Sequence, residues 1–198
     1  MRLLVFLFFG VLTSGQVLAE ANPLLAKLPL CASCHGEQGK SINPQWPNLA
    51  GQHPRYLLKQ LQDMRDSQIR TAPTMNALVN TLSPQEQKEL AEYYAKMPVA
   101  HGTTPVEFLK RGEQLYRGGD SKKHITACIA CHGPTGSGNN QAGFPVLSGQ
   151  HAAYTILQLT AFKKGTRKND LNQIMQDISQ RMGEDDIEAV AHYIEGLH

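Results

Sequence analysis

Apolar residues recur every three or four positions through much of the chain. Towards the C-terminal end, Tyr154, Leu157 and Ala161 share one helical face, and Gly165 follows a few residues later. This spacing predicts an amphipathic helix that glycine terminates. No stretch shows the alternation of a half-buried strand, so the pattern predicts an all-α fold with short helices and long loops. Helices are predicted over residues 54–64, 84–96, 105–116, 152–164 and 183–194.

Two helix starts carry a capping-box signature. Ser83 and Thr104 are each followed by proline at the next position and by glutamate at the third. Such a box satisfies backbone N–H groups that the helix leaves free, and proline suits the first helical position. The first half of the chain lacks a comparable opening helix, because Pro23 and Pro29 interrupt the short stretch before Cys31.

The second half of the chain repeats the first. Residues 31–36 (CASCHG) recur as 128–133 (CIACHG), and residues 46–53 (WPNLAGQH) recur as 144–151 (FPVLSGQH). The offset between the copies grows only from 97 residues at the first cysteine to 100 near the two C-terminal ends. One domain is therefore used twice. The predicted divisions are domain 1 at residues 20–99, a linker at 100–105 and domain 2 at 106–198.

The first 19 residues differ from the rest of the chain. Arg2 precedes a nearly all-apolar run from Leu3 to Leu12, and the small-residue stretch that ends at Ala19 comes before Glu20. These are the parts of a secretory signal that is cleaved after export. A membrane anchor is the competing interpretation, but the apolar run is short for a span of ~20 residues. We therefore predict a signal peptide at 1–19 and a periplasmic location.

The overall composition is that of an ordinary globular protein. Hydrophobic residues make up 41% of the chain and charged residues 18%, and the formal net charge is +2. Basic and acidic side chains are mixed in both halves, without a basic stripe. Binding to nucleic acid is therefore not expected.

All four cysteines lie in two Cys-x-x-Cys-His motifs. This spacing is the attachment signature of c-type haem: two thiols form thioethers with one porphyrin, and the histidine binds the iron as its proximal ligand. A structural zinc site is disfavoured because histidine follows both pairs, and a redox disulfide because no βαβ pattern surrounds them. The sequence thus predicts two covalently bound haem c groups. The residues are Cys31, Cys34 and His35 in domain 1, and Cys128, Cys131 and His132 in domain 2.

A second pattern follows each motif. Pro47 and Pro145 precede Leu-x-Gly at matching positions, and a rigid carbonyl there would suit the ring N–H of the proximal histidine. Together with a methionine before the last helix, these motifs resemble class I cytochromes c. The duplication, with Gly-Gln-His and tyrosine in both copies and Asn-Asp-x-x-x-Ile-Met in the second, resembles the dihaem cytochrome c4 family. The resemblance implies two tandem class I cytochrome c-like domains in which the carbonyls of Pro47 and Pro145 orient the proximal histidines.

The sixth iron ligand decides between electron transfer and catalysis. Met75 and Met175 are methionine in both copies, each about forty residues after its motif. We predict that they are the second axial ligands, because thioether sulfur favours Fe(II) and suits an electron carrier. His53 and His151 also repeat and are the rival ligands, although a capping or surface role explains them better.

Haem propionates need hydrogen-bond donors, and several side chains have the right groups. A core or surface role explains each of them at least as well, so no propionate ligand is assigned. The candidates are Tyr56, Tyr154, Trp46, Arg70 and Arg167.

These predictions indicate a one-electron carrier and not an enzyme, because six-coordinate iron has no open position for a substrate. The resemblance implies a donor such as a quinol-oxidising complex, a terminal oxidase as acceptor, and peripheral association with the membrane. An alternative is the cytochrome subunit of a periplasmic dehydrogenase complex, for example with a flavin-containing partner. A dihaem peroxidase is a third reading, which the two matched methionines argue against. We expect the domains to pack face to face, so that electrons can cross between the haems.

Overall fold

The computed structural model describes residues 23–198, so the predicted signal peptide lies outside the described residues. Within the described part the regular elements are helices, joined by turns and loops that include isolated β-bridges at Asp120–Ile125 and Asn139–Phe144. The all-α prediction is confirmed.

None of the helices in residues 23–198 has the length and apolar character needed to cross a bilayer. The elements are α1 (Pro23–His35), α2 (Pro54–Arg65), α3 (Pro73–Val79), α4 (Pro84–Ala95), α5 (Val106–Gly118), α6 (Ile129–His132), α7 (Ala152–Lys163), the 3₁₀ turn η1 (Leu171–Gln173), α8 (Ile174–Gln180) and α9 (Glu184–Glu195).

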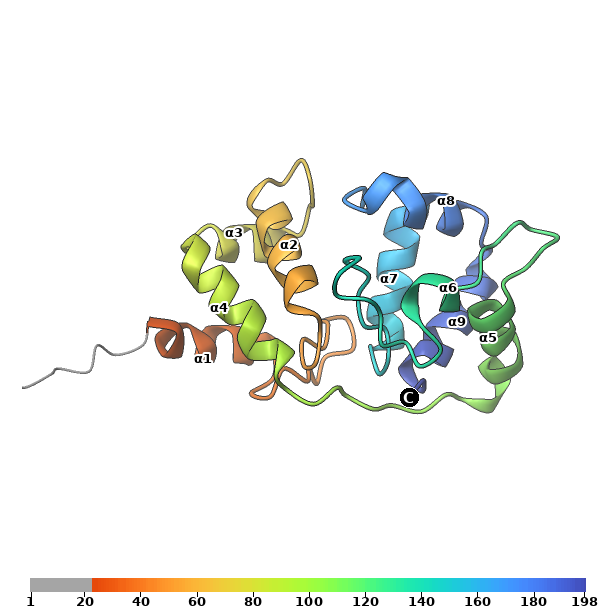
Figure 1. The fold of residues 1–198 in the computed structure, drawn as a ribbon, viewed down its shortest axis with the longest axis horizontal. Helices are drawn as coiled ribbons and strands as arrows, with labels where there is room; N and C mark the ends of the chain where they lie inside the picture. Colours follow the sequence, from red (N-terminus) through yellow and green to blue (C-terminus); the bar gives the residue numbers. More distant parts are fainter. Residues whose placement is uncertain (1–22) are drawn as a thin grey trace, which may run out of the picture.

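Two helical domains lie side by side, joined by an extended segment between α4 and α5 (Figure 1). Domain 1 contains α1 to α4, and domain 2 contains α5 to α9. Each has its own hydrophobic core, centred on residues such as Leu57 and Leu90 in domain 1 and Leu115 and Val190 in domain 2. The duplicated sequence therefore folds as two separately packed units.

The two predicted capping boxes have different outcomes. Ser83 caps α4 as predicted: its hydroxyl accepts the Glu86 N–H, and the Glu86 carboxylate accepts the Ser83 N–H. The prediction for Thr104 is wrong, because Pro105 occupies the N-cap position of α5 and no side chain caps that helix. The Thr104 hydroxyl instead donates to the carbonyl of His192 at 3.2 Å, in the last turn of α9. Carbonyls in a last turn lack regular helical partners and so compete for such a donor.

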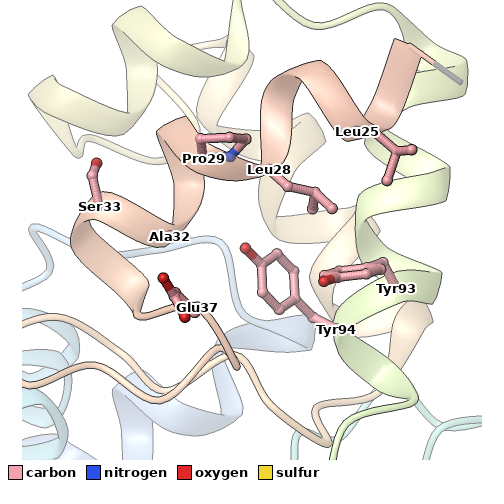
Figure 2. A pocket seen from close by; sticks show the side chains of 8 residues that line it. All are labelled: Leu25, Leu28, Pro29, Ala32, Ser33, Glu37, Tyr93 and Tyr94. Carbon is pink, nitrogen blue, oxygen red and sulfur yellow. The ribbon is translucent and has the colours of Figure 1, made fainter. Parts of the chain in front are cut away.

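The opening helix of domain 1 is more regular than expected. α1 continues through Pro29 and includes the whole motif from Cys31 to His35. Pro29 has no N–H, so the helix loses its bond to the carbonyl of Leu25, near the start of α1. Contact between α1 and α4 is nevertheless sparse, and Figure 2 shows the open pocket that remains between them. The pocket is lined by Leu25, Leu28, Pro29, Ala32, Ser33, Glu37, Tyr93 and Tyr94.

The corresponding helix pair in domain 2 is closely packed. α5 meets α9 at Gly112, where an added Cβ would lie 2.5 Å from both the Ala189 carbonyl oxygen and the Tyr193 Cβ. Only glycine lets the two backbones approach this closely.

Gly112→Ala should destabilise the protein by about 1–3 kcal/mol, because α5 and α9 must move apart to admit the methyl group. Gly118→Ala is the matched control on the same helix, since an added Cβ there meets nothing within 4 Å. Denaturant unfolding of both variants measures the difference. Equal effects of the two substitutions would contradict this account of the packing.

A charged cluster ties α9 to α5 and to the loop before α6. Asp186 is 3% exposed, and its carboxylate oxygens lie 2.6 Å from both Arg111 Nη2 and Lys123 Nζ. The same carboxylate accepts the N–H of Gly183 at the start of α9. Burial opposes ionisation, but these donors outweigh it and lower the pKa of Asp186 to about 2. Its counterpart in domain 1, Glu86, forms no ion pair within the described residues.

Candidate functional site

Each Cys-x-x-Cys-His motif occupies a helical turn of its own domain. In domain 1 the motif is the last turn of α1, and in domain 2 it forms α6 with Cys128 at the N-cap position. Cys31 packs against the core of domain 1 and Cys128 against that of domain 2. None of the four cysteines is paired in a disulfide within the described residues. Within residues 23–198, no group of three or more His, Cys, Asp or Glu side chains is placed to hold a metal ion.

The two motif histidines are buried and oriented by backbone carbonyls. His35 is 7% exposed and His132 is 6% exposed. The Nδ1 of His35 lies 2.9 Å from the Pro47 carbonyl oxygen, and the Nδ1 of His132 lies 3.0 Å from that of Pro145. Burial lowers the pKa of both imidazoles, and the bonds to the carbonyls only partly oppose it. A neutral ring that donates Nδ1–H keeps its lone pair on Nε2, the atom that can bind iron.

The matched methionines lie in short helices of equivalent position. Met75 is in α3 and Met175 is in α8, and both side chains are partly buried. Met175 packs against the same hydrophobic cluster as Cys128. Figure 1 shows α3 and α8 on the same side of the molecule, away from the linker. The unmatched Met64 and Met182 are core residues, 8% and 3% exposed.

Two matched glutamines join the domains through reciprocal hydrogen bonds. The Gln52 side chain accepts the N–H of Val146 and donates to the carbonyl of the same residue, both at 2.9 Å. Gln150 makes the same pair of bonds with Asn48, again at 2.9 Å. Matched residues thus make matched bonds, so the domains meet through equivalent surfaces, as two copies around an approximate twofold axis would.

The rival iron ligands, His53 and His151, bond across the same boundary. The Nε2 of His53 lies 2.8 Å from the Ser137 carbonyl oxygen, and the Nε2 of His151 lies 2.8 Å from that of Ser41. Each histidine occupies the N-cap position of α2 or α7 but makes no capping bond with its side chain. Of the expected capping or surface role, the capping part is therefore wrong, and these partly exposed imidazoles instead connect the two domains.

Sequence reasoning missed that the repeated tyrosine and arginine residues also belong to this boundary. Arg70 donates to the Tyr154 hydroxyl at 3.2 Å, and Arg167 donates to the Tyr56 hydroxyl at 3.1 Å. One sequence signal could have indicated this role at the boundary. The same polar residues recur in both copies, although the fold of a single domain does not need them. Trp46, by contrast, is 41% exposed and makes no side-chain hydrogen bond within the described residues.

Two buried arginines place positive charge at the domain boundary without a described carboxylate in ion-pair contact, and Asp170 attracts Arg167 only from farther away. Arg70 and Arg167 are each 7% exposed, and neither forms an ion pair within residues 23–198. Both donate to Oε1 of Gln60, at 2.7 and 3.2 Å. Two buried guanidinium groups this close together need anions. A haem carries two carboxylates, so the residues at this boundary fit a chain that binds two haems.

Known proteins match the chain over both domains. The family model described as Cytochrome c matches residues 14–98 and again 109–198. A cytochrome c4 of Pseudomonas aeruginosa is 42% identical over 195 residues, which cover 98% of this chain and 96% of the relative. A thiosulfate dehydrogenase electron acceptor of Stutzerimonas stutzeri is 39% identical over 168 residues, which cover 82% of this chain and 76% of the relative.

A solved structure shares the arrangement of both domains. Reduced recombinant cytochrome c4 from Pseudomonas stutzeri superposes with a TM-score of 0.85 at 41% identity. The match covers 89% of this chain and 97% of that one. Such a score over nearly the full length requires that the two domains be placed alike, in addition to having the same fold.

Proposed function

Because the chain belongs to the cytochrome c family, as a dihaem electron carrier of the cytochrome c4 type, we propose that it works in the periplasm and carries electrons to a terminal oxidase. Its donor in this proposal is a quinol-oxidising complex or another upstream protein. The four motif cysteines attach the two haem c groups as thioethers. Bound haem supplies the one-electron couple of Fe(III) and Fe(II).

In this proposal the chain's own side chains would hold the iron of each haem, with one histidine and one methionine in each domain. His35 and His132 would bind the iron through Nε2, while the carbonyls of Pro47 and Pro145 hold each ring by its Nδ1–H. This second bond fixes the orientation of the ring and makes the imidazole a stronger ligand. Met75 and Met175 would each supply a thioether sulfur as the second iron ligand of their domain, and a thioether favours Fe(II).

The observation that carries the proposal is that both domains repeat the same pair, a histidine anchored by a carbonyl and a matched methionine. With a histidine and a methionine bound, each iron would have no open position for a substrate. His53 and His151 are engaged with carbonyls across the domain boundary, so they do not compete for iron. The arrangement supports electron transfer and disfavours a dihaem peroxidase.

The proposed export depends on residues 1–19, which lie outside the described structure. Cleavage near Ala19 would leave the folded part intact, because α1 begins at Pro23. Attachment to the membrane periphery is part of the same proposal, since the mature chain would keep no apolar N-terminal run.

If the protein is a carrier, its reduced form should be oxidised rapidly by membranes that contain a terminal oxidase. Stopped-flow absorbance of the reduced haem bands measures the rate, and membranes with a cyanide-blocked oxidase are the control. Because the formal net charge is only +2, docking depends on a local surface, and added salt should slow transfer only modestly. A dihaem protein that such membranes fail to oxidise would contradict the proposal.

A second candidate function is the electron-accepting subunit of a dehydrogenase, which the similarity to the thiosulfate dehydrogenase electron acceptor favours. This function predicts a stable stoichiometric complex with one dehydrogenase and a slow reaction with oxidase membranes. Purification from native extract distinguishes the two. Co-elution with a dehydrogenase chain, without oxidase turnover, would replace the carrier assignment and leave the haem chemistry unchanged.

A further inference from the structure

The buried arginines at the domain boundary make crossed contacts. Each arginine places its Nη1 2.7 Å from a glutamine Oε1 of its own domain. The Nη2 of Arg167, in domain 2, lies 3.1 Å from the hydroxyl of Tyr56 in domain 1. The Nη2 of Arg70, in domain 1, lies 3.2 Å from the hydroxyl of Tyr154 in domain 2. Each arginine is thus linked to the tyrosine of the other domain.

The two arginines and the two tyrosines lack two kinds of partner that a carboxylate would supply: an acceptor for each hydroxyl hydrogen and an anion beside each guanidinium. Each tyrosine hydroxyl accepts from an arginine, and no acceptor for its own hydrogen lies within the described residues. Neither guanidinium has a carboxylate in ion-pair contact within the described residues: Asp63 pairs with Lys59, and Asp170, which bonds to Gln176, attracts Arg167 only from beyond that distance. A carboxylate beside an arginine and the tyrosine that it contacts would accept a hydrogen bond from both.

The electrostatics at Tyr56 agree with this geometry. Burial raises the pKa of its phenol, but the positive charges of Arg167, Arg70 and Lys59 outweigh burial and lower the pKa overall. The hydroxyl therefore lies in positive surroundings, where it donates well to an anion.

The position of each arginine in the chain assigns it to one haem. Arg70 lies between α2 and α3, five residues before Met75, and Arg167 lies between α7 and α8, eight residues before Met175. Each arginine is therefore on the segment that leads to the proposed axial methionine of its own domain. The carboxylate that it neutralises is accordingly a propionate of the haem in that domain.

We propose that the two tyrosines are positioning residues that act across the domain boundary. Tyr56 of domain 1, together with Arg167, holds a propionate of the haem in domain 2. Tyr154 of domain 2, together with Arg70, holds a propionate of the haem in domain 1. The inference rests on the proposed function, since it needs both haems in place. A donor to a propionate offsets a negative charge that stabilises Fe(III), so each tyrosine raises the reduction potential of the other domain's haem.

Tyr56→Phe and Tyr154→Phe test this inference, because each removes only one hydroxyl. Reduction of the dihaem protein is titrated at equilibrium, and each haem is followed by its own haem-methyl NMR signals, assigned to its domain. Tyr56→Phe should lower the equilibrium constant for reduction of the domain 2 haem roughly two- to tenfold, the factor expected for one hydrogen bond. The domain 1 haem should change little, and Tyr154→Phe should show the reverse pattern.

Tyr93→Phe is the control, because Tyr93 lies in the pocket between α1 and α4 (Figure 2) and makes none of the side-chain hydrogen bonds that join the domains. It should leave both haems unchanged. The arginines are less suitable targets, since both contact Gln60 and a substitution of either would reach both haems.

Three results would overturn the crossed assignment: a larger shift in the haem of the tyrosine's own domain, equal shifts in both haems, or no shift in either. Equal shifts are what a loosened interface would produce. Haem content, measured as pyridine haemochrome, separates this inference from the function on which it rests. Two haems per chain with uncrossed shifts overturn the inference alone, whereas fewer than two haems in the parent protein overturn both.

Discussion

If Met175 is the iron ligand that we propose, replacing it by alanine should convert the domain 2 haem into a centre that binds external ligands. Alanine has no atom that reaches the iron, so carbon monoxide or azide should bind there, whereas the parent protein should bind them poorly. Loss of the thioether should also lower the reduction potential of that haem, by on the order of 100 mV or more. Absorbance spectra with and without carbon monoxide, and a potentiometric titration, measure the two effects.

Two further variants make this experiment specific. Met182→Leu should leave both haems unchanged, because Met182 is a core residue and leucine occupies the matching position 82. His151→Ala should also leave the coordination intact, since its Nε2 already bonds to the carbonyl of Ser41. Carbon monoxide binding by His151→Ala, but not by Met175→Ala, would show that the axial ligand is misassigned. Met75→Ala should open the domain 1 haem in the same way.

Asp186→Asn should destabilise domain 2 by about 3 kcal/mol at neutral pH. The substitution keeps the shape of the side chain but removes the charge that Arg111 and Lys123 share, at 2.6 Å each. Asp186 is 3% exposed, so water does not replace the lost interaction fully. Denaturant unfolding of the dihaem protein, compared with the parent under the same conditions, measures the loss.

The pH dependence of this loss has a definite sign. The pKa of Asp186 falls from 3.8 to about 2 on folding. A carboxyl group with a lowered folded-state pKa stabilises the protein above its unfolded pKa, and the contribution, about 2 kcal/mol here, is lost as pH falls from about 4 to about 2. The difference between parent and variant should therefore be largest at neutral pH and shrink below about pH 4. Glu86→Gln, at the matching position in domain 1, should cost far less, and an equal loss would refute this account.

The helix ends show where local sequence reasoning succeeds and where it fails. Ser83 and Thr104 begin the same motif, yet only Ser83 caps its helix. The difference comes from a tertiary neighbour, because the Thr104 hydroxyl reaches the last turn of α9, 88 residues further along the chain. Pro29 is tolerated inside α1 because the one hydrogen bond that it removes lies close to the helix start.

The haem attachment sites could be predicted because their residues are neighbours in the chain. In Cys-x-x-Cys-His, one helical turn brings two thiols and an imidazole together, whatever the rest of the fold does. Comparison of the two repeats then separated Met75 and Met175 from the core residues Met64 and Met182. Their role as axial ligands stays a prediction, since it depends on atoms that the chain alone does not supply.

The sequence by itself determined the duplicated all-α fold, the two haem motifs and the cysteine pairs that attach the haems. Only the tertiary structure decided what the repeated polar residues do. Gln52, His53 and Tyr56 have their partners in the other domain, 84 to 111 residues away along the chain. Hydrophobic periodicity and motif spacing describe contacts within one turn, one helix or one loop. The contacts between the domains depend instead on how two copies of the same surface meet in space, which no local pattern encodes.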